Sequence, residues 1–285
     1  MEEKSVAKVY AKENSDIFVR LFDNILSRIS HERNRYFSVL VIFDVLFGCG
    51  LFITAVILHS QVEAVSMFTH FVSSLGWGPN GADKVFKYGL VALGILLIPY
   101  IFFLSAKLRA EAHHEHADII YRLTNRALKY WMAALLGLWI LAWFVDIRVP
   151  DFSDAMLIIT LHAIGAFTYF SCSIAGAFLL TKAMTLNGMM RQFQYLIVRF
   201  IIISTIATGI GMVPGLIKAH ASGLMNKIIF QGVLYTLTPE ERVKLIADFT
   251  RTVPFASFFE WLIVLSMLAW FAVTGIQTFF NKTAR

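Results

Sequence analysis

The chain has 285 residues, of which 58% are hydrophobic and only 15% are charged. A soluble domain of this size has no core large enough to bury so much apolar sequence, so the composition excludes an ordinary water-soluble protein. The net charge of +6 does not indicate nucleic-acid binding. The basic residues flank long apolar segments, where anionic lipid headgroups attract them.

Six apolar stretches follow one another along the chain, each close to the ~20 residues that a helix needs to cross a bilayer. Because hydrocarbon offers no water to the backbone, each stretch is predicted to be an α-helix. The sequence therefore predicts an all-α protein, a polytopic membrane helix bundle with six transmembrane helices in one domain, 37–285. The predicted spans are 37–59, 86–106, 130–146, 156–181, 194–217 and 255–280.

The segment 1–36 is charged and lacks the hydrophobic core and cleavage site of a secretory signal. Within it, Ile17, Leu21, Phe22 and Ile25 recur at helical spacing. This pattern predicts a cytoplasmic amphipathic arm that lies in the membrane interface. A simple anchor for the first span is the main interpretation, and a lipid-sensing or partner-docking role is the alternative.

Lys and Arg alternate between the connections and predict the orientation of the spans. The arm and the second and fourth connections are rich in them, whereas the first and third hold only Lys84 and Arg148. The fifth connection, about 218–254, is also basic, but it is the longest and so determines orientation least. Both termini are therefore predicted to be cytoplasmic, with the first, third and fifth connections on the outer side.

Two of the outer connections carry local signals. Segment 73–82 holds three Gly and one Pro and predicts a compact turn in the first connection. In the fifth connection, Thr238, Pro239 and Glu241 have the spacing of a capping box with Pro at the first helical position. A short amphipathic helix over the outer mouth of the bundle is expected to begin there.

Ionisable residues inside the spans are costly unless they are paired, so each is a functional hypothesis. Asp44 lies about seven residues into the first span from the cytoplasmic side, and Arg199 lies about five residues into the fifth. Their depths match within a turn at 1.5 Å per residue. A structural ion pair between Asp44 and Arg199 is the favoured interpretation, with gating or proton transfer as the alternative.

A second pair is predicted near the outer side. His162 lies about six residues into the fourth span and Glu260 about five into the sixth, both counted from that side. Such a pair can join two helices by a buried hydrogen bond, bind a polar headgroup or carry out acid–base chemistry. The chain has none of the nucleophile, zinc-protease or phosphate-loop motifs that would support catalysis.

Short motifs carry a resemblance to a known family. They are Gly78-Pro79-Asn80, Phe86-Lys87-Tyr88-Gly89-Leu90, the run 161–167 and Ser257-Phe258-Phe259-Glu260-Trp261. Together they resemble the DRAM-like (damage-regulated autophagy modulator) superfamily, including prokaryotic six-span membrane proteins of unknown function. The resemblance covers about 37–280 and implies six spans with both ends cytoplasmic. Because the eukaryotic relatives include autophagy modulators and factors of lipid remodelling and lipid asymmetry, it also implies a role in membrane lipids.

The sequence thus predicts an accessory or regulatory protein of membrane lipid homeostasis, with membrane lipids as its partners and no cofactor or metal. A headgroup pocket on the outer side is predicted from Ser74, Asn80, His162, Glu260 and Trp261. Two other functions remain open. One is a lipid-modifying transferase or hydrolase that uses His162 and Glu260. The other is a small-solute or proton-coupled transporter in which Asp44 and Arg199 form an inner gate.

Overall fold

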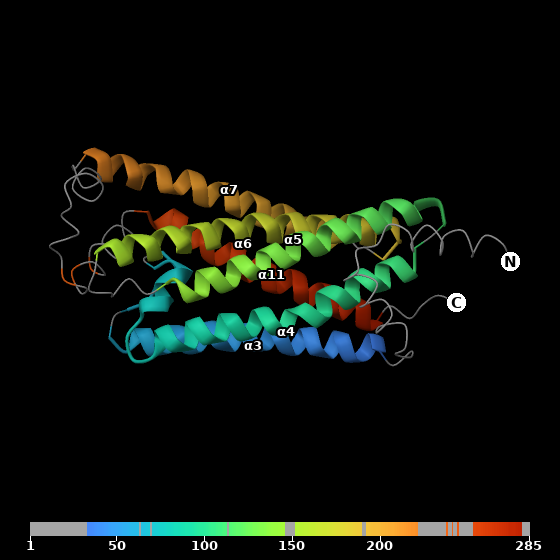
Figure 1. Ribbon diagram of the computed structural model, residues 1–285, viewed down its shortest axis with the longest axis horizontal. Helices are drawn as coiled ribbons and strands as arrows, with labels where there is room; N and C mark the ends of the chain where they lie inside the picture. The colour runs from blue at the N-terminus through green and yellow to red at the C-terminus, as the bar shows by residue number, and fades with distance from the viewer. Residues whose placement is uncertain are drawn as a thin grey trace.

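The computed structural model describes residues 33–62, 64–68, 70–112, 114–145, 152–189, 192–221, 238, 241, 244 and 253–280. Within these residues the chain is all-helical, as the apolar stretches predict. Figure 1 shows the long helices running side by side along the longest axis of the molecule. The helices are α3 (Arg33–Ser60), η1 (Val72–Trp77), α4 (Ala82–Ala110), η2 (His114–His116), α5 (Ala117–Trp143), α6 (Phe152–Leu186), α7 (Gln192–Ala221) and α11 (Pro254–Phe280).

Five of these helices are long and apolar enough to cross a membrane: α3, α4, α6, α7 and α11. The predicted third span, 130–146, forms only the second half of α5. The first half of α5 carries Arg122, Arg126 and Lys129, all exposed, so no sufficiently long apolar window exists in this helix. The protein is therefore a multi-pass membrane protein, and α5 packs within the bundle beside the five apolar helices.

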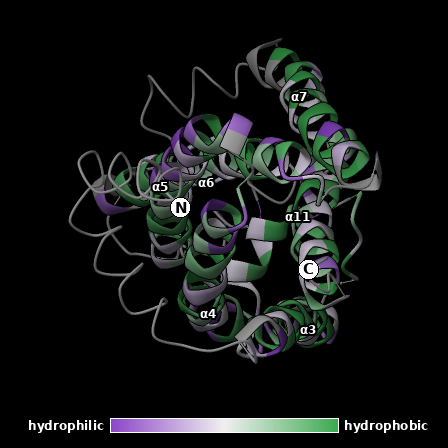
Figure 2. Cartoon of the chain, turned by 90° about the vertical axis from the view of Figure 1, so that its right-hand side faces the viewer, coloured by the Kyte–Doolittle hydropathy of each residue, from purple (hydrophilic) through white to green (hydrophobic). Residues whose placement is uncertain are grey.

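The six long helices form a ring in which each contacts its neighbours in the sequence, and α11 closes the ring by packing against α3. Viewed along the bundle, hydrophobic residues cover most of the helix surfaces (Figure 2). The contact between α5 and α6 is the most extensive, and the contact between α6 and α7 is the weakest link. We call this weak link the α6–α7 seam.

Small residues set the tightest helix contacts. At Gly165 of α6, an added Cβ would stand 2.6 Å from the backbone nitrogen of Leu141 on α5 and 2.9 Å from the carbonyl oxygen of Gly137. At Gly211 of α7, it would stand 3.0 Å from the backbone nitrogen of Ala256 on α11. Both glycines belong to small-residue faces that favour close backbone approach in membranes, so these helices pack through their backbones.

The two ends of the bundle are named here by the short helices they carry, the η1 end and the η2 end. Aromatic side chains fill the core toward the η2 end, where Trp131 of α5 stacks on Trp270 of α11 at 5.8 Å between ring centroids. A second cluster at the η1 end packs Phe52, Phe86 and Trp261 beneath η1. The connection that contains η1 is thus part of the packed core.

The predicted arm, 1–36, lies outside the described residues except for its last four, which begin α3. In the fifth connection the capping box is confirmed. The Thr238 backbone N–H donates to the Glu241 carboxylate at 2.8 Å, and the Glu241 N–H donates to the Thr238 hydroxyl at 3.3 Å. Glu241 and Lys244 are helical, and the rest of the helix predicted there lies outside the described residues.

Candidate functional site

The first connection is held down by two consecutive residues of α11. The Glu260 carboxylate accepts a hydrogen bond from the backbone N–H of Val72 at 3.1 Å, and the backbone N–H of Ser73 lies beside it. The indole N–H of Trp261 donates to the His70 carbonyl oxygen at 2.9 Å. Both side chains are buried, so α11 binds the backbone of the connection at the η1 end and satisfies groups that would otherwise be orphaned.

The turn itself folds back onto α3, as its Gly and Pro content predicts. Asn80 has a positive φ of 56° and Gly81 one of 85°, a left-handed pair that reverses the chain immediately before α4. The Asn80 side-chain amide donates to the Gln61 side-chain oxygen at 3.1 Å and approaches the Leu58 carbonyl at 3.5 Å. The Ser74 hydroxyl donates to the Phe71 carbonyl at 2.7 Å. Both predicted pocket residues therefore stabilise the turn.

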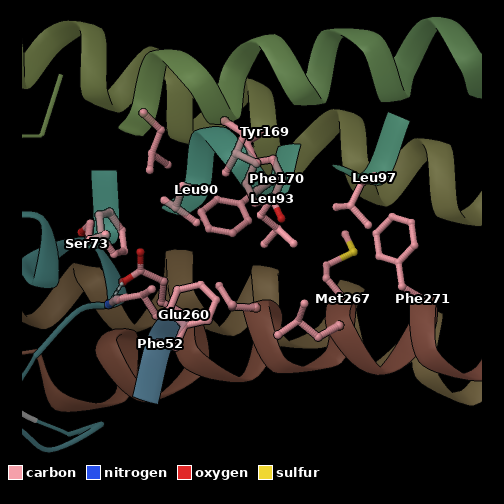
Figure 3. A pocket seen from close by; sticks show the side chains of 16 residues that line it. Phe52, Ser73, Leu90, Leu93, Leu97, Tyr169, Phe170, Glu260, Met267 and Phe271 are labelled. Carbon is pink, nitrogen blue, oxygen red and sulfur yellow. Dashed lines mark hydrogen bonds between the residues drawn. The ribbon is translucent and has the colours of Figure 1, made fainter. Parts of the chain in front are cut away.

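Behind this turn lies an apolar cavity of about 40 Å³ inside the ring. Figure 3 shows Glu260, Ser73 and Phe52 at one end of it and Leu97, Met267 and Phe271 at the other. Glu260 and Phe271 are eleven residues apart on α11, so the residues that line the cavity span about 16 Å of this helix. Its walls are Phe52, Val72, Ser73, Phe86, Leu90, Leu93, Leu97, Leu138, Leu141, Tyr169, Phe170, Glu260, Val264, Met267, Leu268 and Phe271.

The cavity has one polar end and an otherwise hydrophobic wall. Glu260 is the only side chain in its wall that carries an ionisable carboxyl group, and it sits at the η1 end. Five helices and η1 contribute the remaining wall, which is almost entirely hydrophobic, and α7 contributes nothing. The site therefore has a polar end and an apolar body, the usual composition of a pocket for an amphiphilic molecule.

His162 does not join Glu260, so the predicted outer pair is not formed. The Nδ1 atom of His162 lies 3.2 Å from the Leu141 carbonyl oxygen of α5, whereas the partners of Glu260 belong to the first connection. The tight contact at Gly165 explains the difference. His162 lies one turn away on the same side of α6, so it faces α5, and α6 shares few close contacts with α11.

The predicted ion pair between Asp44 and Arg199 is also absent. Asp44 is fully buried and neither of its carboxylate oxygens has a hydrogen-bond partner, while Arg199 is exposed. Their helices are separated because α11 packs between α3 and α7 in the ring. The prediction of this pair was based on the equal depth of the two residues in the membrane. Depth alone does not determine which helices are neighbours.

Sequence reasoning missed most of the cavity wall. Phe86, Leu90 and Leu93 of α4 and Leu138 of α5 are ordinary apolar residues of their helices, with nothing in the sequence that marks them as facing a space. The backbone N–H groups of Val72 and Ser73 were missed for the same reason, because every residue except proline carries one. A search for backbone donors near an intramembrane carboxyl could have indicated η1.

Comparison of the chain with known protein families, with curated proteins and with solved structures gave no match. The candidate site therefore has to be interpreted from its own chemistry. Within the part of the chain that the structure describes, no group of three or more His, Cys, Asp or Glu side chains is placed to hold a metal ion. What the site offers is a buried carboxyl group held by the backbone of η1 and an apolar cavity.

Proposed function

We propose that the protein is a six-span membrane protein that binds a membrane lipid in the cavity closed by Glu260 and acts as an accessory or regulatory factor in membrane lipid homeostasis. The observation that carries the proposal is the cavity itself, with one carboxyl group at the η1 end and an apolar wall that spans about 16 Å of α11. A polar headgroup would lie at Glu260, and an acyl chain would lie among the leucine and phenylalanine side chains.

The Lys/Arg pattern supports an orientation for this site. It assigns the η1 end to the outer side and both termini to the cytoplasm. In that orientation Glu260 lies in the outer leaflet, near the depth of lipid headgroups. We assign α5 as the one crossing in addition to the five apolar helices. Its charged first half would extend beyond the membrane on the cytoplasmic side.

The chemistry of Glu260 favours a headgroup that carries hydroxyl or amine hydrogens. A carboxylate is an acceptor with about four lone-pair sites, and the backbone of η1 donates one hydrogen bond, from Val72, with the Ser73 N–H beside it. The remaining sites are open to donors from a ligand. Charge-assisted hydrogen bonds are about twice as strong as neutral ones, so the charge of Glu260 would contribute directly to affinity.

The α6–α7 seam supports a route into the cavity from the surrounding lipid. Both helices expose large apolar side chains such as Phe167 and Ile210, and α7 packs mainly on α11. The resting cavity, about 40 Å³, is smaller than a lipid chain. Binding would therefore widen it, and Met267 in its wall is an adaptable side chain that can change rotamer.

The two other functions suggested by the sequence receive no comparable support. Acid–base catalysis was tied to His162 beside Glu260, and His162 contacts the Leu141 carbonyl instead. Transport through an inner gate was tied to a pair of Asp44 and Arg199, which is not formed. The resemblance to the DRAM-like superfamily agrees with a lipid role and stays a prediction.

The test is to purify the full chain from membranes in mild detergent and identify co-purified lipids by mass spectrometry. We expect a lipid to be retained by the wild type and by the control Glu115→Gln, whose residue is exposed at η2. Glu260→Gln should lose about tenfold or more of the bound lipid, since a hydrogen bond to a charged group contributes about 1.5–3 kcal/mol.

A second variant tests lipid binding without changing the charge of Glu260. Val264→Phe adds volume to the cavity wall about one turn from Glu260 and leaves the Glu260 carboxyl group in place. It should also deplete the lipid while the protein elutes as a folded species. Equal lipid content in the wild type, Glu260→Gln and Val264→Phe would refute the proposal.

A further inference from the structure

A second buried carboxyl group lies apart from the Glu260 site. Asp44 on α3 has 0% of its surface exposed, and both of its carboxylate oxygens lack a hydrogen-bond partner. Most buried polar atoms in native proteins have a partner, and intramembrane carboxyl groups are rare and usually functional. Asp44 is therefore the buried group that the lipid site does not explain.

The register of α3 against α11 fixes the level of Asp44 in the bundle. Ser38 of α3 hydrogen-bonds Thr278 of α11 at 2.8 Å, and further along α3, Gly48 packs against Leu268. The two helices run in opposite directions, so a step forward along α3 is matched by an equal step back along α11. Asp44 accordingly lies level with Ala272, about 18 Å along the axis from Glu260.

The register against α4 gives the same level. Phe37 stacks on Phe103 at 4.5 Å between ring centroids, and Gly48 contacts Leu93. Asp44 therefore lies level with Leu97. Because Leu93, Leu97, Leu268 and Phe271 line the cavity, Asp44 lies at the level where the cavity ends, at the opposite end from Glu260.

Hydroxyl groups gather within about two turns of this level, on the side toward the η2 end. The Tyr100 hydroxyl faces those of Thr274 and Thr278 but forms no hydrogen bond of standard geometry with either. Thr274 and Thr278 donate their own protons to helix carbonyls, at 3.0 Å and 2.9 Å. Thr278 also accepts from Ser38, and each threonine oxygen keeps at least one lone pair available. We call Ser38, Tyr100, Thr274 and Thr278 the hydroxyl column.

Fixed positive charge is missing from these surroundings. In the helices that pack on this part of α3, Tyr100 is the ionisable group that α4 presents at this level, and α11 has none between Leu268 and Thr278. Basic residues of α3 and α4 lie nine or more residues from this level, toward both ends; Lys87, toward the η1 end, lies over the Trp143 ring. Lys107 of α4 pairs with Glu111 at 2.6 Å, and Arg35 of α3 stacks over Phe279.

An ionised carboxylate without donors in an apolar interior is uncompensated and costs several kcal/mol. Asp44 therefore needs a positive species that is not a side chain of the described residues around it. The hydroxyl column lies within about two turns of its level, and hydroxyl oxygens are of the kind that hard cations prefer as ligands. We propose that Asp44 binds a small monovalent cation, H⁺ or Na⁺, which reaches it from the η2 end along the hydroxyl column.

The experiment measures thermal unfolding of the purified full chain in NaCl and in choline chloride, and over a series of pH values. A ligand that binds only the folded state raises Tm. If Na⁺ is the occupant, NaCl should raise the Tm of the wild type relative to choline chloride by about 4 °C or more. If H⁺ is the occupant, the Tm should rise as the pH falls, without regard to Na⁺.

Asp44→Asn should lose whichever dependence the wild type shows, while the control Asp118→Asn, at an exposed residue of α5, should keep it. If Asp44→Asn does not fold, the pair Tyr100→Phe and Thr274→Val replaces it, because these changes remove hydroxyls of the column while Asp44 remains. A wild type that responds to neither Na⁺ nor pH, or a response that both sets of variants retain, would overturn the proposal.

Discussion

At the scale of single residues, the buried polar side chains at the η1 end bind backbone atoms and do not form the side-chain pairs that the sequence predicted. Glu260 and Trp261 are adjacent in sequence, and both bind backbone atoms of the first connection. The sequence marked both as candidate pocket residues, and a carboxyl group and an indole N–H are both costly to bury without a partner. It could not identify their partners, since a backbone N–H or carbonyl leaves no trace in the residue type.

Trp261→Phe should therefore lower stability without emptying the cavity. The change removes the N–H that donates to the His70 carbonyl, and a hydrogen bond of this kind contributes about 0.5–1.5 kcal/mol to stability. Thermal unfolding of the purified protein checks this, with Trp143→Phe as the control, because Trp143 is 56% exposed. Equal losses for the two substitutions would contradict the role of the indole N–H.

Arg199→Gln should leave the Tm nearly unchanged, because the side chain is exposed and not paired with Asp44. Surface substitutions usually change stability by within about 0.5 kcal/mol. The effects of Asp44→Asn and Arg199→Gln should also add in the double variant, since the two residues share no partner. Recovery of stability in the double variant would restore the ion pair that the sequence suggested.

At the scale of helices, the pattern of small residues predicted packing better than the pattern of charges did. Gly165 and Gly211 both lie at close backbone contacts, because a missing Cβ has the same physical consequence in any membrane helix. The charges were misleading because their depth can be counted along a helix, whereas the neighbour that they face depends on the whole ring. The cavity has no sequence signal, since it is lined by residues that also fill cores.

Gly165→Ala should destabilise the bundle by about 1–3 kcal/mol, the usual cost of overpacking. Its Cβ would meet the backbone of α5, which cannot move aside as a side chain could. The matched control is Gly209→Ala on α7, where an added Cβ has no neighbour within 4 Å and where alanine is the better helix former. Thermal unfolding should show a loss for the first variant only.

At the scale of the whole molecule, hydropathy predicted a helical membrane protein. It did not predict that one of the six long helices, α5, is less apolar than the other five. Five helices have the length and apolar composition of spans. The sixth, α5, is held in the bundle by its contacts with α4 and α6. The order of helices in the ring follows the sequence, which short connections favour. The closure of α11 onto α3, which sets the level of Asp44, could not be predicted from hydropathy.

The orientation can be tested by labelling single cysteines in a background that lacks Cys49 and Cys172. Asn80 lies in the exposed turn at the η1 end and Glu115 lies in η2 at the opposite end. With the η1 end outside, an impermeant thiol reagent applied to intact cells should label a cysteine at position 80 and not one at position 115. The reverse pattern would invert the topology.

The backbone contact between α5 and α6 also bears on how the protein enters the membrane during its synthesis. From Tyr130 to Trp143, α5 offers fourteen uncharged residues, about 21 Å of helix against a hydrocarbon core of about 30 Å. A translocon that examined this segment alone would reject it. Because Gly137 and Gly165 let the two backbones touch, α5 is expected to partition into the bilayer as a helical hairpin with α6. A chain truncated before α6 and fused to a topology reporter should leave α5 uninserted.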